Sequence, residues 1–354
     1  GSVLIHQRLI IDHLCAVLMK KILALVLVAL LVLAGAALAE AKAGEGLYIG
    51  VVYKQSGNAY FQASVDGIQK AADELGFTFE HDGPDDGSND GAIRIIENYI
   101  TKGVDALIIS ANDPDALVDV CTQAMEEGIK VVSYDAEVAY PGRDLDVQPS
   151  SAKNIGLTLL ESIAKSVNYE GQIGIVSAMA TAPNQNLWIQ YIEEELAANE
   201  AYANIEYIGT VYGDDEYQKS FDETQALLNQ YPDLKGLIVP TTVGGPAVAK
   251  CIQDAGRDVK VTGLTLASDM KTFIDAGICD ETFLWNPIDL GYVASYAAVA
   301  LVNEEITGAA GDNVVAGDYN LTVEDKGEDG ATILYLNKLN CFNKETVNDW
   351  VDIL

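Results

Sequence analysis

Short apolar runs alternate with amphipathic segments along most of the chain. Residues 47–53 (LYIGVVY) and 106–110 (ALIIS) are nearly continuous apolar runs rich in Val and Ile. Such runs are typical of parallel strands that are covered on both faces. Between them, Ile93, Ile96 and Ile100 recur at a spacing that places them on one stripe of a helix. The pattern therefore predicts alternating strands and helices.

The same alternation continues into the second half of the chain, without a low-complexity linker between the halves. Two successive arrays of this kind predict an α/β fold with two doubly wound parallel-sheet lobes. We expect strands at 47–53, 77–80, 106–110, 130–134, 172–177, 205–210, 236–239, 259–264 and 282–285, and helices at 61–75, 92–102, 116–127, 155–166, 184–198, 221–230, 245–255, 270–276 and 291–303.

One apolar run near the N-terminus does not fit this alternation. Residues 19–21 (MKK) are followed by the unbroken apolar run 22–33 and by Ala-Leu-Ala at 37–39. This layout predicts a secretory signal peptide that starts at Met19 and is removed before Glu40. The run is short for a membrane span, although an uncleaved anchor is the alternative interpretation. We therefore exclude residues 1–39 from the fold and expect an exported, periplasmic protein that is soluble after cleavage.

The charge and the histidine count exclude several functions. The formal net charge of -32 would repel phosphate backbones and anionic lipids, so nucleic acid is not an expected partner. Only His81 follows the predicted signal peptide, which excludes histidine-based triads and multi-histidine metal sites. The chain also lacks a dinucleotide fingerprint, a phosphate-binding loop and a GxSxG elbow. We expect neither a cofactor nor a metal ion.

The cysteines leave two possibilities open. Cys121, Cys251, Cys279 and Cys341 are widely spaced and form no CxxC pair, so they predict neither a zinc site nor a redox motif. An exported protein can form disulfides, and four cysteines allow three full pairings. Free buried thiols are the alternative.

Polar and aromatic residues gather just after the predicted strands. Ligands of doubly wound sheets bind beyond the carboxyl ends of the strands, so these residues are the candidates for a binding site. Carboxylates, amides, hydroxyls and one lysine beside aromatic rings suit a hydroxylated ligand. The candidate ligand-binding residues are Lys54, Tyr60, Phe61, Asp115, Asp135, Asn184, Gln185, Pro240, Thr242, Trp285 and Asn286.

Several of these candidates have a purely structural alternative. Asp115 lies directly before a predicted helix, where an aspartate commonly serves as an N-cap. Asn184 and Gln185 can cap their helix in the same way, and Lys54 can be an ordinary surface charge. Asp135 has no helix start close behind it, which favours contact with a ligand.

Seven segments jointly carry a family resemblance. From residue 46 to residue 354 the chain resembles type I periplasmic binding proteins, and it is most similar to the branch of rhamnose-type receptors and Lsr-type autoinducer-2 receptors. The segments are 52–61 (VYKQSGNAYF), 109–117 (ISANDPDAL), 133–135 (SYD), 180–188 (ATAPNQNLW), 210–215 (TVYGDD), 239–244 (VPTTVG) and 284–292 (LWNPIDLGY).

The resemblance implies two lobes joined by three crossovers, with hinge closure on the ligand. On this basis we expect an N-terminal lobe from 46–150 plus 286–312, and a C-terminal lobe from 151–285 plus 313–354. It also implies ligand contacts in autoinducer-2 receptors that are matched here by Lys54, Asp135, Gln185 and Pro240.

Two positions depart from the autoinducer-2 pattern. Asn184 stands where that pattern has aspartate, and Thr242 stands where it has alanine. Both changes preserve a site for a polyol, and both look more like the rhamnose-type receptors. The sequence leaves rhamnose, autoinducer-2 and other sugars open as ligands.

The expected function is therefore a non-catalytic one. We expect the substrate-binding component of an ABC importer, a monomer that binds a small sugar-like ligand between its lobes and docks on a membrane permease. The alternatives are a receptor for another pentose or hexose that feeds a signalling partner, and a sugar-acting enzyme. A transcriptional regulator would need a basic helix-turn-helix segment where the signal peptide stands.

Overall fold

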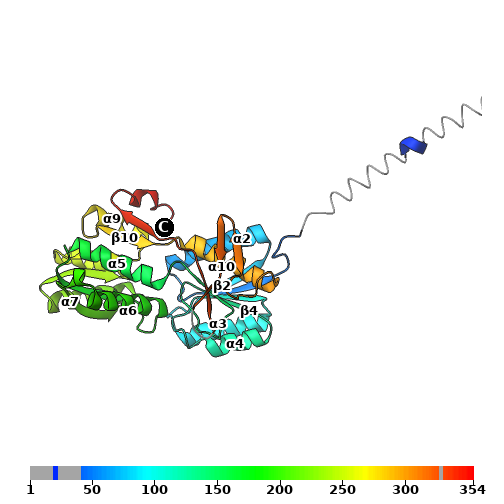
Figure 1. Ribbon diagram of the computed structural model, residues 1–354, viewed down its shortest axis with the longest axis horizontal. Coiled ribbons are helices and arrows are strands. Elements are labelled where there is room, and N and C mark those ends of the chain that lie inside the picture. The colour runs from blue at the N-terminus through cyan, green and yellow to red at the C-terminus, as the bar shows by residue number, and fades with distance from the viewer. Residues whose placement is uncertain (1–18, 23–40, 327–329) are drawn as a thin grey trace, which may run out of the picture. The chain divides into compact units, whose positions relative to one another are not determined.

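The computed structural model describes residues 19–22, 41–326 and 330–354 (Figure 1). The predicted signal-peptide cleavage site lies outside the described residues. Of the predicted signal peptide itself, only residues 19–22 are described, and they are helical and exposed. Residues Ala43–Leu354 form one compact unit, which contains both lobes.

A largely parallel sheet forms the core of the N-terminal lobe. Its strand order is β13-β14-β5-β4-β3-β1-β2, and only the edge strand β13 runs antiparallel to its neighbour. The strands are β1 (Tyr48–Val52), β2 (Thr78–Asp82), β3 (Ala106–Ile109), β4 (Lys130–Tyr134), β5 (Leu145–Gln148), β13 (Glu324–Asp325) and β14 (Thr332–Tyr335).

Helices cover both faces of this sheet, as expected for a doubly wound lobe (Figure 1). The helices α2 (Ala59–Leu75) and α10 (Pro287–Val302) pack together on one face, and α3 (Asn89–Lys102) and α4 (Val118–Glu126) lie on the other. The side chain of Asn58 caps α2 by accepting a hydrogen bond from the Tyr60 amide at 3.0 Å.

The C-terminal lobe has a second, smaller parallel sheet with the order β7-β6-β8-β9, extended through isolated bridges by β10 and then by β15. Helices α5 and α6 pack together, and so do α7 and α8. The elements are α5 (Ala152–Ser166), β6 (Gly171–Ser177), α6 (Pro183–Ala198), η1 (Glu200–Tyr202), β7 (Ile205–Tyr212), α7 (Tyr217–Gln230), β8 (Leu234–Val239), α8 (Gly244–Ala255), β9 (Lys260–Gly263), α9 (Ala267–Asp275), β10 (Glu281–Leu284), β15 (Asn340–Asn343) and η2 (Val347–Asp349).

The chain crosses between the lobes three times, at 149–151, 285–286 and 336–339. The position of the third crossover corrects the expected lobe boundaries. Residues 313–335 belong to the N-terminal lobe, because β14 pairs with β5 and β11 (Asn313–Ala316) packs on α10. β11 itself forms a small hairpin with β12 (Tyr319–Thr322). The short run Thr332–Tyr335 (TILY) fills an open sheet edge, a pairing that periodicity does not reveal.

The remaining sequence expectations concern cysteines and membrane spans. All four cysteines after residue 40 carry free thiols; Cys121, Cys251 and Cys279 are buried and Cys341 is partly buried. In the parts of the chain that the structure describes, no helix combines the length and the hydrophobicity needed to cross a membrane.

Candidate ligand-binding site

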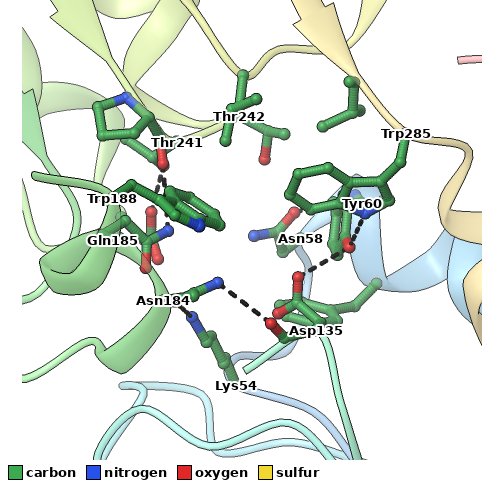
Figure 2. Close-up of a pocket in the computed structure, with 15 residues that line it drawn as sticks. Lys54, Asn58, Tyr60, Asp135, Asn184, Gln185, Trp188, Thr241, Thr242 and Trp285 are labelled. Carbon is green, nitrogen blue, oxygen red and sulfur yellow. Dashed lines mark hydrogen bonds between the residues drawn. The ribbon is translucent and has the colours of Figure 1, made fainter. Parts of the chain in front are cut away.

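A cavity with about 370 Å³ of empty space lies between the two lobes, where the carboxyl ends of both sheets meet (Figure 2). Both lobes contribute to its lining, which consists of Lys54, Asn58, Tyr60, Phe61, Asp135, Asn184, Gln185, Trp188, Asp215, Pro240, Thr241, Thr242, Leu264, Leu284 and Trp285.

Asp135 is the anchored carboxylate of the N-terminal half of the cavity. It follows β4 directly with a φ of 64°, a left-handed conformation that aspartate tolerates better than most residues. Its Oδ1 accepts a hydrogen bond from the Tyr60 hydroxyl at 2.8 Å, and its Oδ2 accepts one from the Ser110 hydroxyl at 2.8 Å. The Trp285 indole N–H donates in turn to the Tyr60 oxygen at 2.6 Å. This chain of hydrogen bonds fixes the carboxylate before any ligand arrives.

Lys54 connects the two lobes across the cavity. Its side chain is only 5% exposed, and Nζ donates to Oδ1 of Asn184 at 3.0 Å. The Asn184 amide lies 3.5 Å from the carbonyl oxygen of Asp135, which adds a second, longer interlobe contact. Farther out, the Thr181 hydroxyl donates to the Asn112 carbonyl at 3.1 Å. Because these contacts join residues of different lobes, the structure is a closed conformation of the hinge.

The C-terminal half of the cavity is less completely paired. Gln185 donates through Nε2 to the Pro240 carbonyl at 3.2 Å, but its buried Oε1 accepts no hydrogen bond. Thr241 donates its hydroxyl hydrogen to a carboxylate oxygen of Asp215. A buried acceptor without a donor costs free energy, and a ligand hydroxyl can supply the missing donor.

Aromatic rings form the apolar walls. The Trp285 ring meets the Tyr60 ring edge to face, with centroids 6.1 Å apart. Trp188 packs on Trp285 with centroids 6.0 Å apart, and Phe61 packs against Tyr60. Flat apolar faces beside carboxylates and amides provide both kinds of contact that a sugar ring can make.

The chain also matches a known protein family. A family model described as a periplasmic binding protein domain matches residues 49–306. The chain belongs to this family. The matched range includes strands and helices of both lobes.

The chain is also similar to solute-binding proteins of known structure. A solute-binding protein of an ABC transporter from Clostridium phytofermentas, solved with bound L-rhamnose, is 34% identical, covers 88% of this chain and 100% of its own, and superposes with a TM-score of 0.85. The LsrB protein of Clostridium saccharobutylicum in complex with AI-2 is 19% identical, covers 86% and 99% of the two chains, and has a TM-score of 0.80. The latter identity shows a shared fold only.

The chain is also similar to the D-ribose/D-allose-binding protein of Pseudomonas aeruginosa. It is 28% identical over 246 residues, which cover 65% of this chain and 74% of the relative.

The structure brings most of the predicted site residues together, but not all of them. Lys54, Tyr60, Phe61, Asp135, Asn184, Gln185, Pro240, Thr242 and Trp285 line the cavity, as the sequence predicted. Two predictions are not placed there. Asp115 is exposed, and its neighbour Asp113 accepts the Asp115 amide hydrogen at 3.0 Å in the turn before α4.

Asn286 also lies outside the cavity lining. Its side chain accepts the Ile288 amide hydrogen at 3.0 Å and so caps α10, whose first residue is Pro287. This capping hydrogen bond accounts for the position of the Asn286 side chain at the start of α10.

Sequence reasoning missed several lining residues. Trp188 carried a usable signal, because it stands four residues after Asn184 and therefore on the same face of α6. Thr241 follows β8 beside residues that were predicted. Asp215 belongs to a segment used for the family resemblance, but no periodicity marks it. The other missed residues are Asn58, Leu264 and Leu284.

The environment of the cavity also shifts two ionisation equilibria. Burial raises the pKa of the Asp215 carboxyl above its ordinary value, and the nearby Lys54 ammonium lowers it in part. Burial raises the pKa of the Tyr60 hydroxyl, and the Asp135 carboxylate beside it raises that pKa further. Tyr60 is therefore a neutral hydrogen-bond donor at ordinary pH.

Proposed function

We propose that this protein is the substrate-binding component of an ABC importer and that it binds a small polyhydroxylated sugar of the rhamnose type between its lobes. One observation carries the proposal: a buried interlobe cavity combines paired and unpaired hydrogen-bonding groups from both lobes with aromatic walls. Membership of the periplasmic binding protein family supports it.

Rhamnose is favoured over autoinducer-2 on two grounds. The relative crystallised with L-rhamnose is 34% identical over nearly the whole chain, whereas the likeness to the AI-2 complex extends to the fold alone. The cavity also has an apolar portion formed by Leu264, Leu284 and the Trp285 ring. A methyl group, such as that of a 6-deoxy sugar, gains free energy from burial against such a surface.

Hinge closure follows from the same contacts. The N-terminal lobe provides Lys54 and Asp135, and the C-terminal lobe provides Asn184, Gln185 and Thr242. A ligand that touches both sets stabilises the closed conformation over the open one, because only the closed conformation makes both sets of contacts at once. The closed form then presents the surface that the membrane permease recognises.

Isothermal titration calorimetry with L-rhamnose, D-ribose and autoinducer-2 tests this function directly. We expect L-rhamnose to bind with one site in the interlobe cavity and more tightly than the other two ligands. Tightest binding of autoinducer-2 would contradict the rhamnose assignment, and the absence of binding for any sugar would contradict the sugar-receptor assignment as a whole.

We also propose that the bound sugar is released unchanged. A sugar-acting enzyme needs a positioned acid or base. The carboxylates that line the cavity are Asp135, which accepts hydrogen bonds from Tyr60 and Ser110, and Asp215, which accepts one from Thr241. Incubation of the protein with L-rhamnose, followed by NMR of the sugar, is expected to show no new signals. Formation of a product would instead support the enzymatic alternative.

Export and assembly complete the proposal. We propose that cleavage after Ala39 releases a soluble monomer that begins at Glu40. Mass spectrometry of the protein secreted by its host is expected to give this N-terminus. Size-exclusion chromatography with light scattering is expected to give the mass of one chain, and a dimer mass would contradict the monomer.

A further inference from the structure

A second cavity lies between the lobes, on the hinge side of the first. It has about 390 Å³ of empty space, and Asn184 and Trp188 line both cavities. Its N-terminal wall comes from β5 and β14 with Asp146 and Tyr335, and its C-terminal wall comes from the first turns of α6 with Leu187. Two of the three crossovers therefore run beside it.

Asp146 is the polar residue that makes this cavity unusual. Its side chain is only 1% exposed. Its Oδ1 accepts hydrogen bonds from the Ser133 hydroxyl at 2.7 Å and from the Gln148 amide at 3.1 Å. Its Oδ2 accepts none, and Nζ of Lys326 lies 4.0 Å away. A buried carboxylate oxygen thus faces the cavity without a hydrogen-bond donor.

The two neighbouring cations pair with Glu137, and neither donates a hydrogen bond to Oδ2 of Asp146. Nη2 of Arg143 lies 3.2 Å from Oε2 of Glu137, and Lys326 contacts the same carboxylate. Burial raises the pKa of the Asp146 carboxyl, and Arg143 and Lys326 offset this only in part. Among the described residues, none therefore donates a hydrogen bond to Oδ2.

We propose that the hinge-side cavity is a second binding site, which takes a small hydroxylated molecule that donates a hydroxyl hydrogen to Asp146 Oδ2. The lining suits this chemistry, because Trp188 and Tyr335 supply aromatic faces while Gln148 and Lys326 supply amide and ammonium groups.

A metal cation fits this cavity less well. Within the described ranges, no group of three or more acidic, histidine or cysteine side chains is arranged to hold a metal ion. Lys326 and Arg143 also balance the charges of Glu137 and Asp146 locally. A neutral molecule that donates one hydrogen bond satisfies Oδ2 without adding charge.

The hydroxylated molecule can come from two sources. It is either a separate small polyol or a second unit of the ligand in the first cavity, since the two cavities adjoin at Asn184 and Trp188, which line both. The existence of the second site does not depend on the proposed function, and only the second source rests on it.

Calorimetry with three probes, namely erythritol, L-rhamnose and a rhamnosyl disaccharide, distinguishes these sources. If the polyol is separate, erythritol or a second equivalent of L-rhamnose binds the natural protein. If it is a second sugar unit, the disaccharide binds as one equivalent and about tenfold or more tighter than L-rhamnose.

The variant Asp146→Asn replaces the unpaired acceptor by a donor of the same size, and it is expected to abolish whichever of these effects is seen. Asp90→Asn, which removes the same charge from an exposed position in the first turn of α3, is expected to leave it intact. If the natural protein and Asp146→Asn bind all three probes alike, the second site does not exist.

Two further variants keep this test independent of folding and of the first cavity. Ala152→Leu fills the hinge-side cavity with methyl groups and is expected to reproduce the loss seen with Asp146→Asn. Asp135→Asn weakens binding in the first cavity only, so it is expected to preserve erythritol binding. If only the rhamnose assignment is wrong, erythritol binding still tests the second site. Erythritol binding that Ala152→Leu leaves unchanged would overturn the location proposed here.

Discussion

The two halves of the interlobe cavity are built differently. In the N-terminal half, both carboxylate oxygens of Asp135 already accept hydrogen bonds from Tyr60 and Ser110. In the C-terminal half, the buried Oε1 of Gln185 accepts none. The N-terminal half is thus complete without a ligand, and the C-terminal half is not.

The two halves of the cavity therefore contribute differently to ligand binding and to closure. A preorganised carboxylate loses little entropy when it binds, so the N-terminal half can select the ligand first. An unpaired buried acceptor costs about 1–3 kcal/mol, so it destabilises the closed conformation when no ligand is bound. A ligand that donates a hydrogen bond to Oε1 of Gln185 removes this cost and so stabilises the closed conformation.

The largest effect is expected from Asp135→Asn, which breaks the preorganised half. Asparagine keeps the size and tolerates the φ of 64° but loses the charge. Losing charge-assisted hydrogen bonds should weaken sugar binding by about 100-fold in calorimetry. Since Tyr60 and Ser110 also lose their carboxylate, the free energy of unfolding of the ligand-free protein should fall.

Asp115→Asn is the matched control for this variant, because Asp115 is exposed and outside the cavity lining. It is expected to leave the sugar affinity unchanged. Equal sugar affinities of the two variants would show that Asp135 does not contribute to ligand binding.

Gln185→Leu sharpens the comparison in the other half. The variant keeps most of the volume but removes the acceptor that awaits the ligand. One neutral hydrogen bond is worth about 1 kcal/mol, so we expect affinity to fall by about five- to tenfold. Urea unfolding of the ligand-free protein should show a smaller loss than Asp135→Asn shows. A loss of unfolding free energy as large as that of Asp135→Asn would contradict the difference between the two halves.

Thr181→Ala probes closure without touching the cavity. It removes the interlobe hydrogen bond to the Asn112 carbonyl, which only the closed form makes. A bond at this partly exposed position should change the sugar affinity by about two- to fivefold. Thr158→Ala removes a comparable bond within one lobe, from Thr158 to the Asn154 carbonyl, and should leave affinity unchanged. An equal effect of both variants would argue against a specific role in closure.

The smallest expected effect concerns pH. Burial raises the pKa of the Asp215 carboxyl in the folded protein above its ordinary value of 3.8. In the pH window between the unfolded and folded pKa values, Asp215 is therefore protonated in the folded protein but ionised in the unfolded chain. Its contribution to stability is present below this window and is lost as the pH rises through it. Asp215→Asn removes the titration, so its free energy of unfolding relative to the natural protein should be higher at about pH 7 than at about pH 4. A difference that does not vary with pH would contradict the shift.

Several site residues were predictable because they follow directly from strand positions. Lys54, Asp135 and Pro240 stand at the ends of β1, β4 and β8, and the sheet geometry brings such ends together. Asp115 and Asn286 also stand close behind strands, but Asn286 caps α10 and Asp115 is exposed outside the cavity lining. A sequence does not show which way a polar side chain turns at a strand end, because capping and ligand contact use the same residue types.

By itself, the sequence determined the α/β class, the two lobes and most of the strand-end residues. Periodicity and composition are local properties, so they predict helices and strands without knowledge of the tertiary contacts. The tertiary structure alone decided that β14 joins the N-terminal sheet, that Trp188 and Asp215 reach the cavity, and that Gln185 and Asp146 each keep an unpaired oxygen. These features depend on which distant segments meet and on which hydrogen-bond partners are already taken there, and no local pattern records either.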